Sequence, residues 1–152
     1  MTEPEPSLRT RAEELVGTEF HVGDWVTITQ EQIDAFGAAT GDNHWIHTDP
    51  VRARRESPFG TTVAHGYLTL ALLPSQLGGF FQRLGATRTI NYGLNRVRFI
   101  APVRAGGKIR AHFTMKTAEE NGDGLRVTLD VSIEADDQEK PVCRAETIAL
   151  CF

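Results

Sequence analysis

The sequence predicts an α+β fold in which a curved antiparallel sheet wraps around one long, buried helix. Residues from about His65 to Leu77 are apolar on nearly every side, so a helix there must be buried rather than laid on a surface. The segments that follow alternate apolar and polar residues, which is the pattern of strands with one buried face. At 152 residues, the chain is long enough to form one domain around one core.

The beginning of the chain is expected to precede the domain. We expect residues 1–10 to be a disordered tail and residues 11–152 to form a single domain. The tail is acidic and has no apolar h-region, so it does not have the pattern of a signal peptide. A helical turn is expected at Arg11–Val16, and a short strand at residues 18–22.

Capping residues predict two further helices. Thr29 and Gln32 have the spacing of a capping box, and the helix that they open should end near Gly41. Asp49 suits the N-cap of a second, short helix, and Pro50 suits its first turn.

The second half of the chain predicts the sheet. Strands are expected at residues 89–100, 108–117, 125–134 and 141–152. Gly93 marks a possible bulge in the first of them, and Gly122 and Gly124 supply the turn of a hairpin. Pro74 should kink or tighten the end of the buried helix, because proline removes one backbone hydrogen bond.

Composition excludes several classes of protein. A net charge of -4 without a basic run argues against a general nucleic-acid binder. No stretch reaches the 18 or so apolar residues of a membrane span. Cys143 and Cys151 lie in one expected strand, about 26 Å apart at the rise of an extended chain, which is too far for a disulfide. We therefore expect reduced, buried cysteines in a cytoplasmic protein.

Asp42 and His47 are the candidate catalytic residues. Five positions along a helix would turn their side chains roughly 140° apart, and along a strand would put them on opposite faces. They converge only if the chain between them bends, and Gly41, Asp42 and Asn43 tolerate such a bend. A carboxylate and an imidazole held together in this way could bind and activate a water molecule.

Less specific interpretations apply to the same residues. Asp42 and His47 could be turn residues only, or could ligate zinc or iron together with His44 and Asp49, although no distant additional ligand is evident and we expect no metal. His65 reads as a structural residue at the start of the buried helix. Arg52, Arg54 and Arg55 form a short basic cluster that could bind phosphates. A solvated helix face is the simpler interpretation of this cluster.

Three motifs give the sequence a family resemblance. They are Thr40-Gly-Asp-Asn-His-Trp-Ile-His-Thr-Asp49, Ala64-His-Gly66, and Asn91-Tyr-Gly-Leu-Asn-Arg-Val-Arg-Phe99 followed by Pro102-Val103. In this order and spacing they resemble the MaoC-like dehydratases, also called (R)-specific enoyl-CoA hydratases or hydratase 2, over nearly the whole chain after residue 20. The family has the hotdog fold, a sheet wrapped around a helix.

One position departs from the family pattern. His44-Trp45 stands where the family usually has Asn-Pro, which is closer to the branch of single-hotdog 3-hydroxyacyl-thioester dehydratases. The departure leaves Asp42 and His47 in place but bears on the shape of the pocket, and so on the preferred acyl length.

The resemblance implies reversible hydration of a trans-2-enoyl thioester to the (R)-3-hydroxyacyl thioester. Asp42 and His47 would share the acid and base roles, with no cofactor, and the Gly66 N–H would stabilise the enolate oxygen. The expected substrate contacts are Val63, Ala64, His65 and Gly66, with Asn91, Tyr92, Gly93 and Leu94 as further candidates. The substrate would be an acyl-CoA or acyl-carrier-protein thioester, and two chains would form a homodimer with continuous sheets.

Two other functions fit the same fold. A hotdog acyl-CoA thioesterase would use the same thioester pocket, and a non-catalytic subunit would lend its pocket to a partner in a heterodimeric dehydratase. The acyl length, the carrier and the direction of the reaction in the cell are left open by the sequence.

Overall fold

A single antiparallel sheet of six strands forms the body of the molecule. The computed structural model describes residues 6–152, so the expectation of a tail at residues 1–5 lies outside the described residues. The strand order is β1-β4-β5-β6-β3, and β2 also pairs with β4. The strands are β1 Glu19–Val22, β2 Val26–Thr27, β3 Thr89–Phe99, β4 Lys108–Asn121, β5 Gly124–Ala135 and β6 Cys143–Cys151. The predicted α+β class is confirmed.

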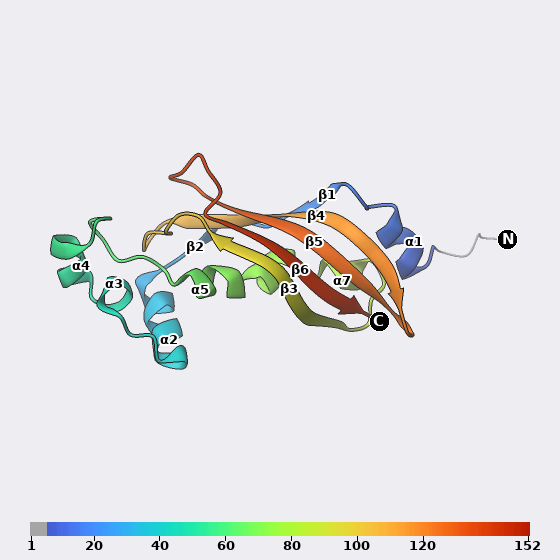
Figure 1. Ribbon diagram of the computed structural model, residues 1–152, viewed down its shortest axis with the longest axis horizontal. Helices are drawn as coiled ribbons and strands as arrows, with labels where there is room; N and C mark the ends of the chain where they lie inside the picture. The colour runs from blue at the N-terminus through green and yellow to red at the C-terminus, as the bar shows by residue number, and fades with distance from the viewer. Residues whose placement is uncertain (1–5) are drawn as a thin grey trace.

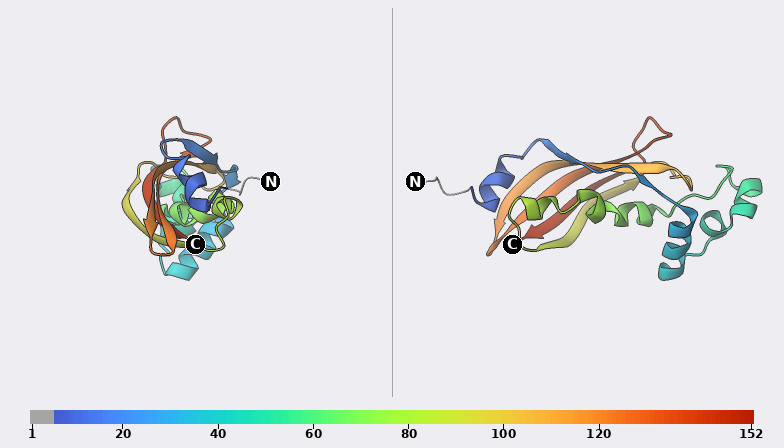
Figure 2. Two further views of the ribbon diagram at one scale, coloured as in Figure 1. Left: turned by 90° about the vertical axis from the view of Figure 1, so that its right-hand side faces the viewer. Right: turned by 180° about the vertical axis from the view of Figure 1, so that it is seen from behind.

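Seven short helices accompany the sheet in the described part of the chain. They are α1 Leu8–Glu13, α2 Gln30–Thr40, α3 Trp45–Thr48, α4 Pro50–Glu56, α5 Gly66–Ala71, α6 Leu73–Leu77 and α7 Phe80–Arg83. Figure 1 and Figure 2 show α5 to α7 running along one face of the curved sheet, while α2, α3 and α4 lie together beyond one end of it. None of these helices is long and apolar enough to cross a membrane.

The first helix begins earlier than the sequence suggested. Helix α1 starts at Leu8, three residues before the expected turn at Arg11 and within the stretch expected to be a tail. The Ser7 side chain accepts a hydrogen bond from the Thr10 N–H and satisfies a donor of the first turn. The predicted caps of α2 and α4 are confirmed, because Thr29 and Gln32 form a capping box and Asp49 accepts from the Arg52 N–H.

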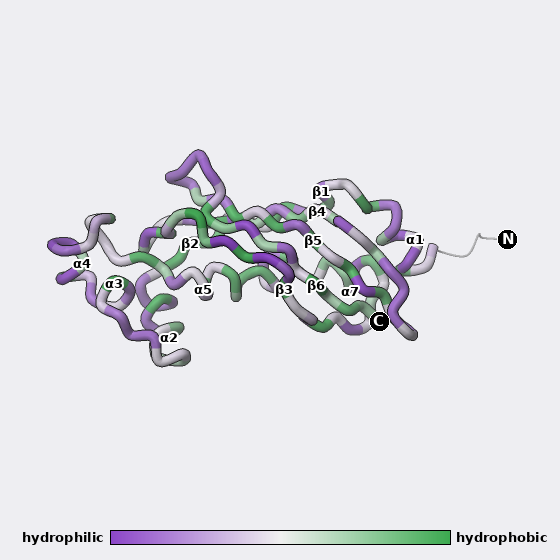
Figure 3. The backbone as a smooth tube through the Cα atoms, viewed as in Figure 1, coloured by the Kyte–Doolittle hydropathy of each residue, from purple (hydrophilic) through white to green (hydrophobic). Residues whose placement is uncertain are grey.

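The strands are paired as their alternation predicts. Strand β5 pairs with β4 and β6, and its odd-numbered residues from Leu125 to Ala135 are buried against the helices. The register of β3 shifts between Asn91 and Gly93, so the predicted bulge at Gly93 is confirmed. Figure 3 shows hydrophilic and hydrophobic residues following one another along these strands, and a tube at α5 that is pale at first and green further along.

The central helix is broken, and it is not buried on all sides. Helices α5 and α6 meet at Leu72, and Pro74 lies in the first turn of α6, so the predicted kink is confirmed. Buried positions such as Leu68 and Leu73 face the sheet, but Tyr67 is 70% exposed. The prediction that this helix is buried on every side is therefore wrong for the single chain, because the sheet covers only one side of it.

A buried glutamine fastens the central helix to the sheet. Gln76 on α6 accepts from the Ala111 N–H at 3.0 Å and donates to the Asp24 oxygen at 3.1 Å. His21 donates from Nε2 to the main-chain oxygen of Gln76 at 2.9 Å. These bonds satisfy polar groups that would be costly to bury alone. They fix α6, and with it α5, against β1 and β4.

Both cysteines are buried and free, as predicted. Cys143 and Cys151 stand at the two ends of β6. Burial raises the pKa of each thiol to about 11, so both remain protonated thiols near neutral pH.

Candidate active site

The bend between Asp42 and His47 has a well-defined cause. Helix α2 ends at Gly41, which adopts the left-handed conformation with φ 82° and donates to the Gly37 oxygen at 2.8 Å. The chain then reverses, and His44 caps α3 by accepting from the Ile46 N–H. The two elements bring a carboxylate oxygen of Asp42 and a ring nitrogen of His47 within 4.8 Å of each other. The predicted convergence of the pair is confirmed.

The His47 ring has a defined tautomer. Its Nδ1 lies 2.7 Å from the main-chain oxygen of Val63, and a carbonyl oxygen can only accept, so Nδ1 carries the proton. Nε2 is then the nitrogen with a free lone pair. Burial lowers the pKa of His47, and the neighbouring His65 and His44 lower it further, against the opposing effects of Val63 and Asp42. The ring is therefore neutral and able to accept a proton near neutral pH.

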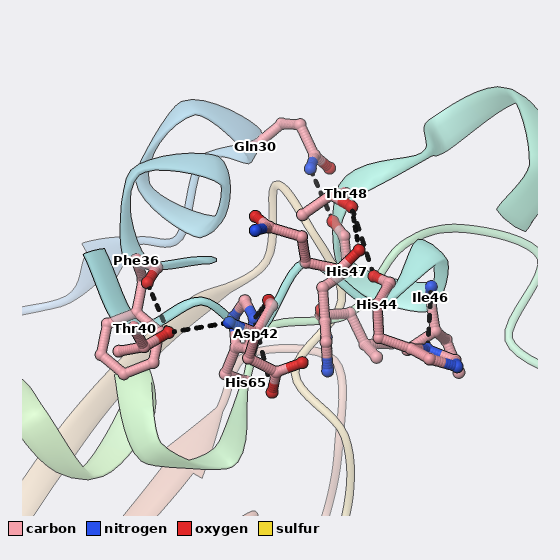
Figure 4. A network of polar contacts seen from close by, with 11 residues as sticks. Gln30, Phe36, Thr40, Asp42, His44, Ile46, His47, Thr48 and His65 are labelled. Atoms are coloured by element: carbon pink, nitrogen blue, oxygen red, sulfur yellow. Dashed lines mark hydrogen bonds and ion pairs between the residues drawn. The ribbon is translucent and has the colours of Figure 1, made fainter. Parts of the chain in front are cut away.

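Asp42 and His47 are close enough to share one water molecule. Their ligand atoms lie within 4.8 Å of each other, a distance that a water bonded to both groups can span. Figure 4 shows the Asp42 carboxylate and the His47 ring on the same side of the bend, with His65 beside them. The Asp42 side chain is 58% exposed, so water from solvent can reach the pair.

The third group at this site, His65, is the one that the sequence did not connect to the pair. Its side chain is 3% exposed, and its ring stacks on that of His47 with 3.9 Å between the centroids. Its Nε2 lies 2.8 Å from the main-chain oxygen of Asp42. His65 is 23 residues from Asp42, so only the tertiary structure reveals this contact.

Asp42, His47 and His65 offer three possible metal ligands, but their geometry does not suit one ion. The lone pair of an imidazole lies in the plane of its ring, and the planes of His47 and His65 are stacked at only 26°. Nearly parallel rings direct their lone pairs side by side rather than toward one point. Of the other proposed ligands, Asp49 caps α4 and His44 caps α3. The cluster is therefore better suited to proton transfer than to metal binding.

The Val63–Gly66 segment runs beside the pair. The Val63 N–H donates to the Ile46 oxygen at 3.1 Å, and the Ala64 N–H donates to the Val103 oxygen at 2.8 Å. Gly66 then begins α5, and the Phe99 ring lies directly over it. A Cβ at Gly66 would lie 2.8 Å from Phe99 Cγ, which is closer than real Cβ atoms approach. A cavity of about 200 Å³ adjoins Gly66 and Phe99.

The other expected substrate contacts lie elsewhere in the chain. Asn91, Tyr92, Gly93 and Leu94 all line a cavity of about 400 Å³ between the central helix and strands β3, β5 and β6. The opposite wall is apolar and comes from Leu70, Leu73 and Leu77. No residue of the Asp42–His47 pair lines this cavity, so the structure of the single chain does not bring the two groups together.

The unusual His44-Trp45 pair is accommodated without displacing the catalytic candidates. The Arg52 guanidinium lies over the Trp45 ring, with its central carbon 4.4 Å from the ring centroid. Arg52 also forms an ion pair with Glu56 at 2.7 Å. Arg52 thus belongs to the solvated face of α4, as the simpler interpretation of the basic cluster predicted. The His44 ring lies edge-on to His47, with 6.4 Å between centroids.

Comparisons with known proteins identify related sequences and a shared fold. Residues 11–136 match the MaoC like domain family. The chain is 48% identical over 126 residues to "3-hydroxyacyl-thioester dehydratase Z" of Mycobacterium tuberculosis (strain H37Rv), covering 82% of this chain and 83% of that protein. It is 41% identical over 138 residues to "Nodulation protein N" of Rhizobium meliloti, covering 90% and 86%. Among solved structures, the (R)-hydratase from A. caviae involved in PHA biosynthesis has a TM-score of 0.67 at 26% identity, covering 86% and 96%.

Proposed function

Because the chain belongs to the MaoC-like domain family, we propose that it hydrates trans-2-enoyl thioesters reversibly to (R)-3-hydroxyacyl thioesters, as a hydratase/dehydratase of fatty-acid metabolism. The observation that carries the proposal is the proximity of the Asp42 carboxylate to the His47 ring, whose Nδ1 is held by Val63 so that Nε2 is free. The fold and the relatives alone would fit a catalytically inactive subunit as well, whereas this pair supplies the acid and the base that the reaction needs.

In the hydration direction, the water oxygen bonds to C3 of the substrate. One O–H bond of the water breaks as its proton passes to the pair, and the electrons of the C2–C3 double bond shift toward the thioester oxygen. A proton from the pair then forms the new C2–H bond. His47 Nε2 is the natural acceptor of the first proton, because the lowered pKa of His47 keeps the ring unprotonated near neutral pH and Val63 holds the Nδ1 proton. Asp42 assists or returns the proton to C2, so the two steps belong to the pair.

The charge that grows on the thioester oxygen requires a hydrogen-bond donor. The Gly66 N–H is the proposed donor, since it lies in the segment that also holds His47 through Val63. A glycine is required here by the closeness of Phe99, and the absence of a side chain also lets the thioester approach the backbone. Val63, Ala64 and His65 line the approach in this proposal.

The acyl chain needs an apolar space, and we propose the cavity of about 400 Å³ between the central helix and β3 for it, although the Asp42–His47 pair does not line this cavity in the single chain. The proposal therefore assigns Asn91, Tyr92, Gly93 and Leu94 to substrate binding through that cavity. The thioester carrier is proposed to be CoA or acyl carrier protein, and no cofactor is invoked because water is the only co-reactant.

We further propose that the enzyme is a homodimer joined through β3. Strand β3 is at the edge of the sheet, and it exposes large apolar residues to solvent: Ile90 at 42%, Tyr92 at 62%, Leu94 at 47% and Phe99 at 44%. An unpaired, apolar strand edge is a ready template for another strand. Pairing of β3 with its copy would continue the sheet, cover these residues and close the cavity that Asn91–Leu94 line.

A cytoplasmic location is in keeping with the two free thiols.

The proposed activity is tested with the purified chain and crotonyl-CoA. Hydration is followed by the loss of enoyl-thioester absorbance and by chiral analysis of the product, with Asp42→Asn and His47→Ala as variants. Both variants should lose nearly all activity while retaining their fold. Release of free thiol would instead identify a thioesterase. An inactive pure chain that gains activity only with a second protein would identify a non-catalytic subunit.

A further inference from the structure

The main-chain oxygen of Asp42 is enclosed on two sides. His65 Nε2 lies 2.8 Å from it, within hydrogen-bonding distance. On another side, a Cβ added to Gly37 of α2 would lie only 3.0 Å from the same oxygen, so the backbone of α2 is in close contact with it. The position of Asp42 is therefore defined by contacts to its main chain, while its carboxylate is largely exposed and lies 3.9 Å from His65 Nε2.

The surroundings of His65 hold its ring in place. Its ring is buried between Phe36, at 5.1 Å between centroids, and His47, at 3.9 Å. The carbonyl oxygen of Asp42 can only accept, so Nε2 carries the proton and Nδ1 is the bare nitrogen. Within the described chain, this Nδ1 is buried without a hydrogen-bond partner. The polar contacts of the His65 ring are therefore made through Nε2.

A second side chain holds the main chain of the other catalytic residue. Gln30 Nε2 donates to the main-chain oxygen of His47 at 2.7 Å. The Gln30 carbonyl oxygen accepts a short hydrogen bond from the Thr62 hydroxyl, next to Val63. Asp42 and His47 are thus each fixed through a carbonyl oxygen by a side chain from a different part of the chain.

We propose that His65 is a positioning residue that sets the separation of Asp42 and His47, because it holds the backbone of one and supports the ring of the other. The inference rests on the proposed hydratase function of that pair. Gln30 completes the arrangement at the far side of His47. A shift of about 1 Å in such a pair can reduce the rate of a reaction about 100-fold.

The experiment compares two substitutions of similar size. Gln places an N–H donor near the position of imidazole Nε2, so His65→Gln should retain hydration of crotonyl-CoA within about 10-fold of the unsubstituted enzyme. His65→Leu removes the donor but keeps an apolar group, and its kcat should fall about 100-fold while KM changes much less. Equal activity of His65→Leu and the unsubstituted enzyme would overturn the proposal. Equal loss in both variants, together with the loss of one ionisation from the pH profile, would identify His65 as an acid or base and overturn it as well.

Two further measurements keep the proposal testable if His65→Leu does not fold. Gly37→Ala leaves His65 intact but presses on the Asp42 oxygen, so it should lower kcat with little effect on KM. NMR of the ring nitrogens in the unsubstituted protein should show neutral His65 as the Nε2–H tautomer, with this N–H in a hydrogen bond, and an Nδ1–H tautomer would contradict the proposal. The NMR result does not depend on activity, so it separates a failure of this inference from a failure of the proposed function.

Discussion

His47 Nδ1 lies 2.7 Å from the main-chain oxygen of Val63, and this bond connects two parts of the proposed mechanism. It assigns the base nitrogen, because a proton held at Nδ1 leaves Nε2 free. It also ties His47 to the segment that ends at Gly66, the proposed donor to the thioester oxygen. The proposed base and the proposed donor to the thioester oxygen are therefore connected by a single short segment, Val63–Gly66.

The first prediction concerns pH. Burial is the largest cause of the lowered pKa of His47, so the ring should stay neutral to a lower pH than an exposed histidine, whose ordinary value is about 6.5. A base works only when deprotonated, so kcat/KM should fall as the pH decreases through this lowered pKa, with its midpoint below about 6.5. The measurement is kcat/KM for crotonyl-CoA hydration from pH 5 to 8, in steps of about half a unit. A midpoint above the ordinary value would show that the carboxylate of Asp42 dominates over burial.

The second prediction concerns Gly66. In Gly66→Ala, the new methyl group would lie 2.8 Å from the Phe99 ring, so the ring or the start of α5 must move. We expect kcat to fall at least about 10-fold, because the N–H donor moves with the backbone. Adding Phe99→Leu should make room for the methyl group and recover part of the loss. Circular dichroism and the melting temperature serve as checks on folding, and full activity of the single variant would exclude a role for the close approach at Gly66.

Local sequence patterns predicted the elements around the site. The capping box at Thr29 and the cap at Asp49 are contacts between residues three positions apart, so they can be read directly from the chain. The bend could be inferred by a similar argument, because only a reversal at Gly41 lets Asp42 and His47 meet. The start of α1 was missed because a serine cap preceding a weakly apolar stretch gives little signal.

Contacts between distant segments could not be predicted in the same way. His65 read as a structural residue at the start of the central helix, and nothing in its neighbours indicates that its ring meets Asp42 and His47. The bond from Gln30 to His47 spans 17 residues and depends on how α2 packs against α3. The exposure of Tyr67 follows from the sheet covering one side of α5, which an apolar composition cannot reveal.

The third prediction concerns stability. Gln76→Leu removes the acceptor for the Ala111 N–H and the donor for the Asp24 oxygen at a site that is 6% exposed. An unsatisfied buried polar group costs about 1–3 kcal/mol, so the free energy of unfolding should fall by at least that amount. The measurement is chemical denaturation of both proteins. Gln82→Leu is the matched control, because Gln82 is exposed and its substitution should change stability by no more than about 0.5 kcal/mol. Equal stability of the two variants would show that Gln76 does not fasten α6 to the sheet.

The last prediction concerns the free edge of β3. Leu94 is 47% exposed on this strand, and a charge there should prevent the edge from pairing with a second copy. Light scattering of the unsubstituted protein at micromolar concentration should give the mass of a dimer, and Leu94→Lys should give 16.8 kDa, the mass of one chain. Activity should fall with the dimer, because Leu94 also lines the cavity proposed for the acyl chain. Val51→Lys is the control, since Val51 is 69% exposed on α4, away from β3, and should leave the mass of the assembly unchanged. A monomeric unsubstituted protein with full activity would show that a single chain forms the complete site, and the exposed apolar residues of β3 would then need another partner.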